Sequence, residues 1–308
     1  MIIGSLNIRG GNSAKRRRIN RLIVKGKVDV IFIQESKLCD VSVCTARSFW
    51  KNIDVDFSFL PSVGLSGGII TLWNSAFVQV LNSFGGMGYL GIKVIWKGEI
   101  HYLVNVYSPC SIAEKRILWS KLLHLKTVFS DSEWVIAGDF NAVKNGSERK
   151  GLSVVARSRE WRDFSDFINL SNLIDVPSKG KKFSWFGGDG KAISRIDRFL
   201  VSDNLVNKWR IVGQLVGDRD ISDHCPVWLL IDKAIWGPKP SMVNSEWFSN
   251  CDFLPFVEKA WRSISVVGRC NFVLKEKLRI LKERLRWWNI NIFGKFNSAI
   301  EEGVKGIM

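Results

Sequence analysis

The chain has 308 residues, of which 46% are hydrophobic and 12% aromatic, enough for one large domain with a buried core and a smaller appendage. Lys and Arg (45) outnumber Asp and Glu (29), and the net charge of +16 favours a polyanionic partner, either nucleic acid or an anionic membrane surface. The six cysteines form no C-x-x-C pair, so we expect neither a zinc site nor a disulfide framework but small apolar residues in a reducing compartment. The first residues lack the regions of a signal peptide, which disfavours secretion.

Short apolar runs bounded by Gly, Pro, Asn or Asp predict strands along most of the chain. These runs are residues 2–8, 28–34, 67–73, 90–96, 100–107, 133–140, 195–201 and 225–231. Between them, apolar residues recur every three or four positions and predict helices over Ser13 to Lys25, Ala113 to Phe129 and Ser158 to Leu170. This mixture favours a layered α/β or α+β domain over an all-β one.

The segment from Phe57 to Ile92 carries no charged residue and therefore tests the membrane interpretation. Pro61, several glycines and Asn74 interrupt it, which a spanning helix of about 20 apolar residues would not tolerate well. We therefore expect strands and turns in this segment, and no membrane span.

The composition changes between Lys233 and Pro240, where two prolines and a glycine predict a domain boundary. Residues 271–294 have the pattern of an amphipathic helix, which we interpret as packing on a neighbouring domain or on itself rather than as a nucleic-acid-binding arm. Its apolar stripe consists of Leu274, Leu278, Leu281 and Leu285. The expected organisation is a domain over 1–232 and a helical segment over 233–308.

Polar side chains end several of the predicted strands, and a buried polar group is costly unless it has a partner. They are Asn7, Glu35, Tyr107, Asp139 and Asn141. If these strand ends converge, they form a cluster of carboxylates, amides and a phenol. Such hard oxygen ligands, without Cys or paired His, suit Mg²⁺ or Mn²⁺ rather than zinc.

Asp139 and Asn141 are two residues apart, so on an extended chain both point to the same side and face one ion or phosphate. Gly138 before them allows a close backbone approach or a turn. A plain Asx turn explains "GDFN" equally well.

Asp197 lies in an otherwise apolar stretch between Arg195 and Arg198, where a structural salt bridge is one interpretation. The other is that Asp197 orients His224, because an imidazole that acts as a base commonly has a carboxylate partner. Asp223 and His224 are adjacent and would face opposite ways in a regular strand, a constraint that a turn ending at Pro226 would relax.

Taken in order, "LNIRG", "IFIQES", "VNVYSP", "AGDFNAV", "SRIDRFL" and "SDHCPV" resemble the motif series of the endonuclease/exonuclease/phosphatase superfamily, over roughly Met1 to Asp232. The resemblance implies an α+β, deoxyribonuclease I-like four-layer sandwich, with two packed, mainly antiparallel sheets flanked by helices and here a C-terminal helical extension. "FSWFGGDGKAISRIDRFLVS", "WGPKP" and the C-terminal helical region resemble the endonuclease of plant LINE-type non-LTR retrotransposons and its linker toward reverse transcriptase.

The implied function is a Mg²⁺-dependent phosphodiester hydrolase, with Mn²⁺ as an alternative ion, that nicks duplex DNA and leaves a 3′-hydroxyl and a 5′-phosphate. The implied partners are duplex DNA and a reverse transcriptase domain in a parent polyprotein, with no membrane. We expect a monomer and a nuclear location, with the cytoplasm as an alternative. Two other interpretations stay open: a phosphatase of phosphoinositides or other phosphate esters, and an inactive remnant that binds nucleic acid or protein.

The resemblance also implies roles for the metal-binding residues. Glu35 is the expected principal Mg²⁺ ligand, with Asn7 beside it and Asp223 available to the same or a second ion. The metal neutralises phosphate charge and steadies the leaving oxygen.

Further roles follow for the catalytic residues. His224, oriented by Asp197, activates water or stabilises the oxygens of the phosphorane. Asp139 positions the nucleophile or protonates the leaving group, and Asn141 and Tyr107 hydrogen-bond the scissile phosphate.

Arg9, Trp185 and Arg195 are the expected substrate-binding residues. Arg9 stands two positions after Asn7, where abasic-site repair relatives carry Asp, which disfavours such a specialist; it contacts phosphate or forms a surface ion pair. Trp185 lies in the Gly-rich region from Lys179 to Lys191, interpreted as a DNA-contacting loop or as a β-hairpin tip.

Overall fold

The computed structural model describes residues 1–64, 66–129, 132–151, 158–188, 190–231, 247–248, 250–268 and 270–293. The chain divides into two compact units, Met1–Ile235 and Trp236–Met308. The predicted boundary region from Lys233 to Pro240 lies outside the described residues, so the division at residue 232 stays a prediction. In the part of the chain described, no helix is both long and apolar enough to cross a membrane.

The first large sheet of the first unit mixes parallel and antiparallel strands. Its β1 and β2 run parallel, with Asn7 opposite Gln34, and its other central neighbours are antiparallel. In spatial order the strands are β11 (Ser178–Gly180), β15 (Ile211–Val216), β16 (Val227–Ile231), β1 (Ile3–Asn7), β2 (Val30–Gln34), β4 (Ser66–Asn74) and β3 (Val55–Val63).

The second large sheet is likewise mainly antiparallel. Only β7 and β8 run parallel in it, with Tyr107 opposite Asp139, among the described strands. Its spatial order is β10 (Leu173–Asp175), β14 (Asp197–Ser202), β8 (Glu133–Asp139), β7 (Glu99–Tyr107), β6 (Tyr89–Trp96) and β5 (Gln79–Gly86). The eight apolar runs predicted as strands correspond to β1, β2, β4, β6, β7, β8, β14 and β16.

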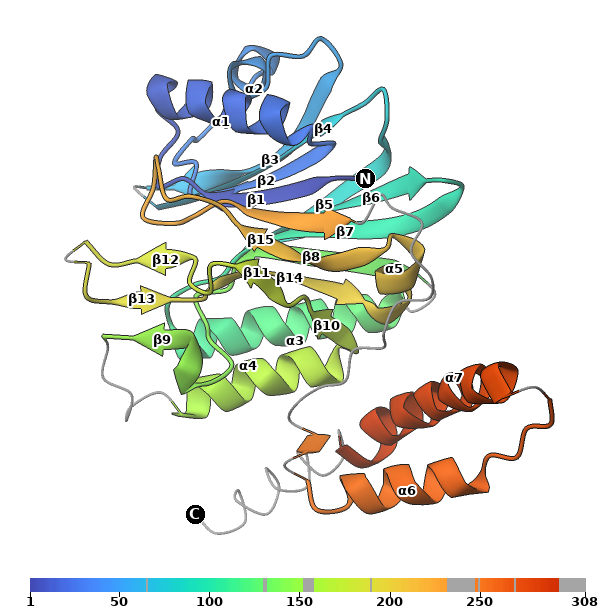
Figure 1. The fold of residues 1–308 in the computed structure, drawn as a ribbon. Coiled ribbons are helices and arrows are strands. Elements are labelled where there is room, and N and C mark those ends of the chain that lie inside the picture. Colours follow the sequence, from blue (N-terminus) through green and yellow to red (C-terminus); the bar gives the residue numbers. More distant parts are fainter. Residues whose placement is uncertain are drawn as a thin grey trace. The chain divides into compact units, whose positions relative to one another are not determined.

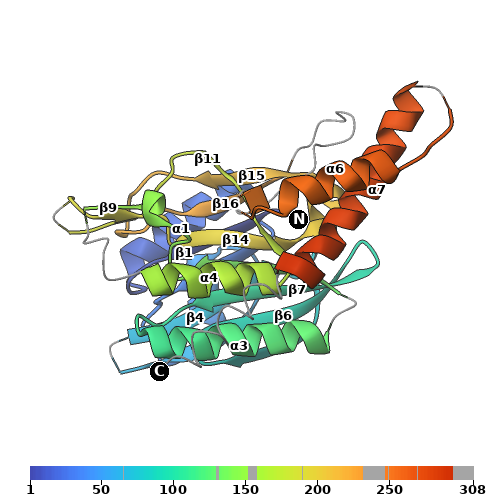
Figure 2. The ribbon, with the colours of Figure 1, turned by 90° about the horizontal axis from the view of Figure 1, so that it is seen from below.

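The two sheets pack face to face, and helices cover their outer faces (Figure 1). Helices α1 (Ser13–Gly26) and α2 (Val43–Phe49) lie on the first sheet, with Ile19 and Phe49 in a buried cluster. Helices α3 (Ile112–Val128) and α4 (Ser158–Leu170) cross the second sheet, as Figure 2 shows from below. This is the predicted four-layer sandwich, and the three predicted helices of this unit are confirmed.

The short helix α5 (Asp203–Lys208) follows β14. A further small sheet lies at the edge on the left of Figure 1. It consists of β12 (Trp185–Phe186), β13 (Ile193–Ser194) and β9 (Arg149–Lys150). Trp185 pairs with Ser194, so the Gly-rich region around Trp185 forms a β-hairpin.

The uncharged segment forms strands and turns, as expected, and its Pro61 lies in β3. Strand β3 is an edge strand of the first sheet. A proline there, which has no backbone N–H, removes no hydrogen bond on the side that faces no other strand. The pairing with β4 joins Leu60 to Ile69 and Ser62 to Gly67, passing over Pro61.

The described part of the second unit contains α6 (Phe253–Ser263), α7 (Cys270–Trp288) and a π-helical turn (Asn289–Phe293). Phe253 and Trp288 form its buried centre, with Trp247, Phe256 and Leu285 against them. The predicted helix is therefore present, but its apolar stripe is not uniformly buried. Leu274 and Leu278 are 53% and 51% exposed.

The six cysteines are free thiols, and only Cys225 is buried. The remaining five are exposed.

Candidate active site

Polar strand ends from both large sheets meet at one edge of the first unit. Asn7 ends β1, Glu35 follows β2, and Tyr107 and Asp139 end the neighbouring parallel strands β7 and β8. Asp197 begins β14 directly opposite Asp139 in antiparallel register. The predicted convergence of these residues is therefore present.

The side-chain amide of Asn7 connects the two sheets at this edge. Its Nδ2 donates to Oε1 of Glu35 at 3.1 Å and to Oδ2 of Asp139 at 2.9 Å, and its Oδ1 accepts from the backbone N–H of Arg9 at 3.1 Å. Asn7 is fully buried, so these partners satisfy a group that would otherwise be costly. In this arrangement the amide nitrogen faces the two carboxylates, which gives Asn7 a positioning contact rather than a ligand contact.

A second polar bridge between the sheets lies deeper in the same unit. Nε2 of Gln34 donates to Oδ1 of Asn105 at 2.6 Å, and Nδ2 of Asn105 donates to the carbonyl of Ile70 at 3.0 Å. Gln34 directly precedes Glu35, and Asn105 lies two residues before Tyr107 on β7, so this buried bridge fixes the spacing of the sheets below the site.

His224 and Asp197 form a buried hydrogen-bonded pair. Nδ1 of His224 lies 2.9 Å and 3.0 Å from the two carboxylate oxygens of Asp197, and its Nε2 is 3.8 Å from Oδ2 of Asp139. Burial disfavours the imidazolium, but Asp197 and Asp139 outweigh it and raise the pKa of His224 to about 9. Burial in turn raises the pKa of Asp139 to about 7, although His224 opposes this shift.

Asp139 and Asn141 form an Asx turn rather than an extended pair. Oδ1 of Asp139 accepts from the backbone N–H of Asn141 at 2.9 Å, and Asn141 has a φ of 47°. Nδ2 of Asn141 donates to the carbonyl of Ser108 at 2.7 Å. The expectation that both side chains point to one side of an extended strand is wrong, because the chain turns immediately after Asp139.

Left-handed backbone conformations cluster at this edge. Arg9, Glu35 and Asn141 have φ values of 44°, 49° and 47°. Such conformations cost non-glycine residues of the order of 1–3 kcal/mol each and persist only where surrounding contacts enforce them. Here Gly10 donates its N–H to the carbonyl of Glu35 at 2.7 Å, which ties the segments after β1 and β2 together.

Tyr107 faces the carboxylates of Glu35 and Asp139. Burial raises the pKa of its phenol, and both carboxylates raise it further, with a side-chain hydrogen bond to Glu35. The hydroxyl therefore stays protonated and is a hydrogen-bond donor at this edge.

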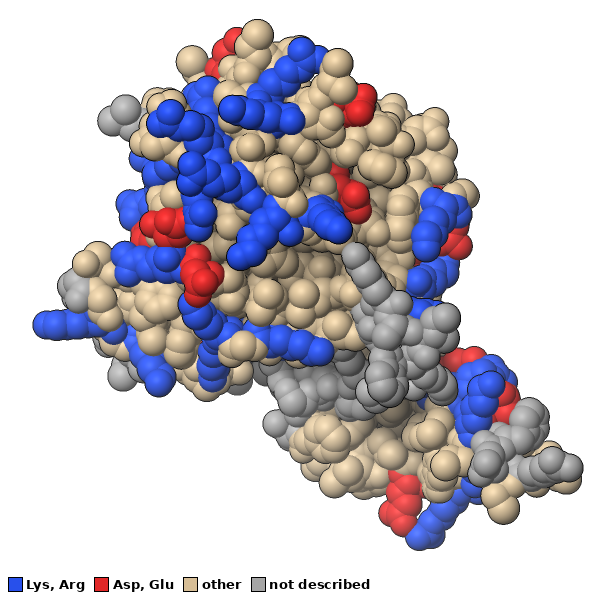
Figure 3. All heavy atoms as spheres, turned by 45° about the horizontal axis from the view of Figure 1, so that its top comes forward, with Lys and Arg blue, Asp and Glu red and all other residues tan. Residues whose placement is uncertain are grey.

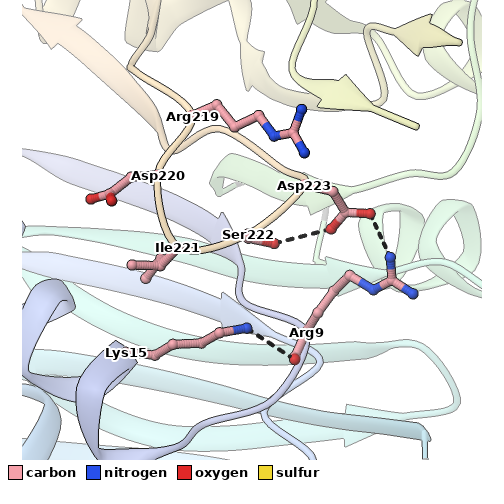
Figure 4. Close-up of a pocket in the computed structure, with 7 residues that line it drawn as sticks. All are labelled: Arg9, Lys15, Arg219, Asp220, Ile221, Ser222 and Asp223. Atoms are coloured by element: carbon pink, nitrogen blue, oxygen red, sulfur yellow. Dashed lines mark hydrogen bonds and ion pairs between the residues drawn. The ribbon is translucent and has the colours of Figure 1, made fainter. Parts of the chain in front are cut away.

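Asp223 has partners of its own beside this cluster (Figure 4). Its Oδ2 accepts from Nη1 of Arg9 at 2.6 Å and from the indole N–H of Trp185 at 3.0 Å. Phe186 donates its backbone N–H to the carbonyl of Asp223 at 3.0 Å, which fastens the hairpin to the loop that carries His224. Asp223 and His224 point to different partners, as adjacent residues of a regular strand would, so the turn ending at Pro226 does not direct both side chains to one partner.

Arg195 is not brought to this cluster. Its guanidinium pairs with Glu148 at 2.7 Å and Asp175 at 2.8 Å, next to the fully buried Arg198, which binds the same two carboxylates. Arg195 is 9% exposed, so its side chain has a structural position and is not presented to a substrate. Asp197 was the alternative candidate for a salt bridge to its neighbouring arginines. The carboxylates that pair with Arg195 and Arg198 are instead those of Asp175 and Glu148.

Glu35 and Asp139 are the two carboxylates whose oxygens meet around Asn7, and this donor set fits Mg²⁺ or Mn²⁺. Mg²⁺ is typically held by one or two carboxylates, with waters and phosphate oxygens in its remaining positions. Asp139, Asp197 and His224 also offer ligand atoms within 4.8 Å of one another. We interpret that group as a hydrogen-bonded pair with a neighbour, because a metal on Nδ1 of His224 would break its bond to Asp197.

Sequence reasoning missed several side chains that support the site. Hydroxyls of Ser184 and Ser222 accept from the backbone N–H groups of Asp197 and His224, at 3.0 and 3.2 Å. The buried Lys115 of α3 donates to the carbonyl of Asn141 at 2.6 Å and to Glu160. Lys115 lay in a region predicted only as a helix. Because Lys is rarely buried without a partner, nothing in the sequence indicated that it lies in the interior.

Solved structures of other proteins share this layered fold. The 3′-5′ exonuclease of Neisseria meningitidis superposes with a TM-score of 0.62 at 18% identity, over 75% of this chain and 100% of that one. An AP endonuclease from Leishmania major gives 0.58 at 16% identity, over 76% and 88%. The endonuclease domain of TRAS1, a telomere-specific non-LTR retrotransposon, gives 0.57 at 14% identity, over 75% and 97%. The fold class is thus the deoxyribonuclease I-like sandwich.

Residues 4–224 match the model of the Endonuclease/Exonuclease/phosphatase family, and the chain belongs to that family. Membership makes it a hydrolase of the nuclease and phosphatase type. A transposon TX1 uncharacterized 149 kDa protein of Xenopus laevis is 26% identical over 275 residues, 84% of this chain. The match spans 20% of that relative's length. The predicted likeness to a transposon protein is confirmed.

Proposed function

We propose that this chain is a divalent-metal-dependent endonuclease that hydrolyses one strand of duplex DNA and leaves a 3′-hydroxyl and a 5′-phosphate. The observation that carries the proposal is the meeting of Glu35, Asp139 and the His224–Asp197 pair around the buried amide of Asn7. A phosphodiester needs charge neutralisation, a positioned nucleophile and a protonated leaving group, and this set of residues can supply all three.

The distribution of charge supports a nucleic acid as the substrate. The net charge is +16, and Lys and Arg gather on the part of the surface where α1 lies (Figure 3). Residues 15–18 of that helix are Lys-Arg-Arg-Arg, and none of them is buried. Basic residues beside a strand-end site attract a polyanionic backbone and position it without reading its sequence.

In this proposal Glu35 would hold a Mg²⁺ ion, which would neutralise charge on the phosphate and steady the leaving oxygen. Asn7 fixes the spacing of Glu35 and Asp139. His224, kept as an imidazolium by Asp197, donates from Nε2 to an oxygen of the phosphorane, and its raised pKa favours this role over that of a general base. Asp139, with its raised pKa, gives a proton to the leaving 3′-oxygen as the bond from water to phosphorus forms and the bond to the 3′-oxygen breaks, and the proton released by the attacking water restores Asp139.

Tyr107 and Asn141 are the proposed donors to the scissile phosphate. The Tyr107 hydroxyl stays protonated, and the Asn141 amide nitrogen has a second hydrogen beyond the one given to Ser108. Trp185 is proposed to contact the DNA beside the cleaved bond, because its hairpin forms the rim next to Asp223.

We further propose that the chain acts as part of a longer transposon protein in the nucleus, where the nick supplies a primer to a reverse transcriptase. The relative of Xenopus laevis supports this context. Because the match covers 20% of that protein, the protein is about five times as long as the matched segment.

The test is nicking of supercoiled plasmid by the purified chain with Mg²⁺. We expect open circular DNA to form with the wild-type chain, and Glu35→Ala and His224→Ala each to slow nicking by about 10²–10⁴-fold. The matched controls Glu99→Ala and His124→Ala alter exposed residues and should nick at the wild-type rate. EDTA should stop nicking, and a folded wild-type chain that leaves the plasmid supercoiled would refute the proposal.

The end groups and the substrate class need separate assays. A polymerase should extend the nick without prior phosphatase treatment if a 3′-hydroxyl is left. Inositol phosphates, offered at the same protein concentration, should release no phosphate. Their hydrolysis without DNA nicking would favour a phosphatase instead.

A further inference from the structure

The carboxylate of Asp223 at this edge is already paired with a cation of the chain itself, the guanidinium of Arg9. Nη1 of Arg9 lies 2.6 Å from its Oδ2, and the indole N–H of Trp185 lies 3.0 Å from the same oxygen. Its other oxygen accepts from the hydroxyl of Ser222 at 3.2 Å. Both oxygens therefore have hydrogen-bond donors, and the negative charge is balanced.

The Arg9 backbone is fixed before any ligand arrives. Its N–H donates to Oδ1 of Asn7, and its carbonyl accepts from Nζ of Lys15 at 3.1 Å. The residue has a left-handed φ of 44°, and the following Gly10 is tied to the carbonyl of Glu35. These contacts fix the backbone of Arg9 on the segment that is tied to Glu35, and the bond to Asp223 directs its guanidinium.

The Arg9 side chain is nevertheless open to solvent. It is 56% exposed, against 11% for Asp223. It lines a shallow hollow of about 330 Å³ together with Lys15, Arg219 and the loop of residues 220–223, and Figure 4 shows its guanidinium directed at Asp223. A guanidinium has five N–H donors, so an Arg that spends one on a carboxylate can still bind a phosphate oxygen with the others.

We propose that this chain binds a single divalent cation, at Glu35, and that the Arg9 guanidinium stands in for a second ion beside Asp223 and contacts a phosphate of the DNA strand. The inference rests on the proposed function and specifies its metal stoichiometry. It assigns Asp223 to holding Arg9 and removes it from the metal ligands that the sequence suggests.

Electrostatics explains why the two cations exclude each other at Asp223. A divalent ion on that carboxylate would have to displace the Arg9 and Trp185 donors and then lie next to a displaced guanidinium of like charge. Arg9 supplies positive charge without the cost of dehydrating Mg²⁺, and its planar donors suit phosphate oxygens. Glu35 has no such cation bonded to its carboxylate among its described hydrogen bonds and ion pairs, so it is the carboxylate left for the metal.

The test is a titration of the full chain with Mn²⁺, with free Mn²⁺ followed by electron paramagnetic resonance and nicking assayed in parallel. We expect one bound Mn²⁺ per chain in the wild type and none in Glu35→Gln. Asp223→Asn should keep the single ion, with an affinity changed by less than about threefold. Circular dichroism shows in each case whether the variant is folded.

The outcomes separate the inference from the proposed function. Two ions on the wild-type chain, or an affinity lowered about tenfold or more in folded Asp223→Asn, would overturn the inference while leaving a metal-dependent nuclease intact. Absence of any bound Mn²⁺ together with absence of nicking would overturn both.

Arg9→Ala tests the phosphate contact. We expect it to raise the KM for DNA, to lessen the salt dependence of binding by about one unit of the log–log slope, and to leave the ion at Glu35 in place. The control Lys208→Ala removes the exposed partner of Glu99 and should change neither quantity. An unchanged KM and salt slope in folded Arg9→Ala would refute the phosphate role.

Discussion

The imidazole of His224 and the carboxylate of Asp197 lie 2.9 Å apart and are 4% and 2% exposed, so each is the other's main polar partner in a region closed to water. Because this bond fixes the ring orientation and the proton on Nδ1, Asp197→Asn should lower the kcat of nicking by about 10²–10⁴-fold without unfolding the chain. Single-turnover nicking and circular dichroism check this. The control Asp218→Asn changes a carboxylate that is 93% exposed. Equal rates in the two variants would contradict a role for the pair.

The pH profile of nicking distinguishes two roles for His224. Its pKa is raised to about 9, so a required imidazolium is present at neutral pH and is lost above about 9. Because Asp139 must also be protonated to serve the leaving oxygen and its pKa is raised to about 7, we expect kcat/KM to be level up to about pH 7, to fall about tenfold per unit above it, and to fall more steeply above about pH 9. A rate that instead rises between pH 7 and 9 would mean that the neutral imidazole acts as a base.

The sequence was sufficient to predict the layers and the convergence of the polar strand ends. The apolar runs predict strands, and their polar ends need partners. These ends are Asn7, Glu35, Tyr107 and Asp139. The order of the motifs predicted that all these strands belong to one fold. Position along a strand is a local property, which is why these predictions agree with the structure.

Contacts between segments distant in sequence were not predictable in this way. Arg9 and Asp223 are 214 residues apart, and only the folded chain reveals that they pair. Glu35 and Asn141 have φ values above 40° although neither is a glycine, so no glycine in the sequence marks these positions. Tertiary contacts enforce the two conformations. Arg195 has the same flanking sequence whether it faces DNA or a buried carboxylate, and its neighbours Glu148 and Asp175 decide the outcome.

The buried ionic cluster predicts a loss of stability in acid. Burial alone would raise the pKa of Glu148, but Arg198 and Arg195 outweigh it and lower that pKa to about 2. An acid with a lowered folded-state pKa stabilises the fold above its unfolded value of 4.5 and loses this contribution as the pH falls toward 2. The contribution is about 3 kcal/mol at pH 7, and the part lost between pH 7 and pH 3, about 2 kcal/mol, is measurable by urea unfolding.

Glu148→Gln is the matching variant for the acid prediction. It should be less stable than the wild type by about 3–5 kcal/mol at pH 7, because Arg198 keeps only Asp175 as a carboxylate partner. Its stability should also vary less between pH 5 and pH 3. An acid dependence as steep as that of the wild-type chain would assign the effect to other carboxylates.

Lys115 is predicted to be a positioning residue for Asn141. Its Nζ donates to the Asn141 carbonyl at 2.6 Å, and its charge is paired with Glu160 in the interior. Lys115→Met should lose about 3–5 kcal/mol, because Glu160 stays buried without its partner. Adding Glu160→Leu should restore much of that stability, whereas kcat should remain about tenfold or more below the wild type.

The double variant separates positioning from stability. Lys121→Met changes an exposed lysine of the same helix and serves as the control in both urea unfolding and nicking. If the double variant regained the wild-type kcat along with its stability, Lys115 would have only a structural role.

Gly138 should tolerate no side chain. Its φ is 144°, and a Cβ there would lie 2.0 Å from the carbonyl oxygen of Val106 on the paired strand β7. Gly138→Ala must therefore separate β7 from β8 beside Tyr107 and Asp139, and we expect it to lose more than about 1 kcal/mol of stability and to slow nicking. Gly188→Ala, with no atom within 4 Å of its Cβ, should stay within about 0.5 kcal/mol of the wild type. Urea unfolding of the two variants compares them, and equal stability would show that the strands move apart at no cost.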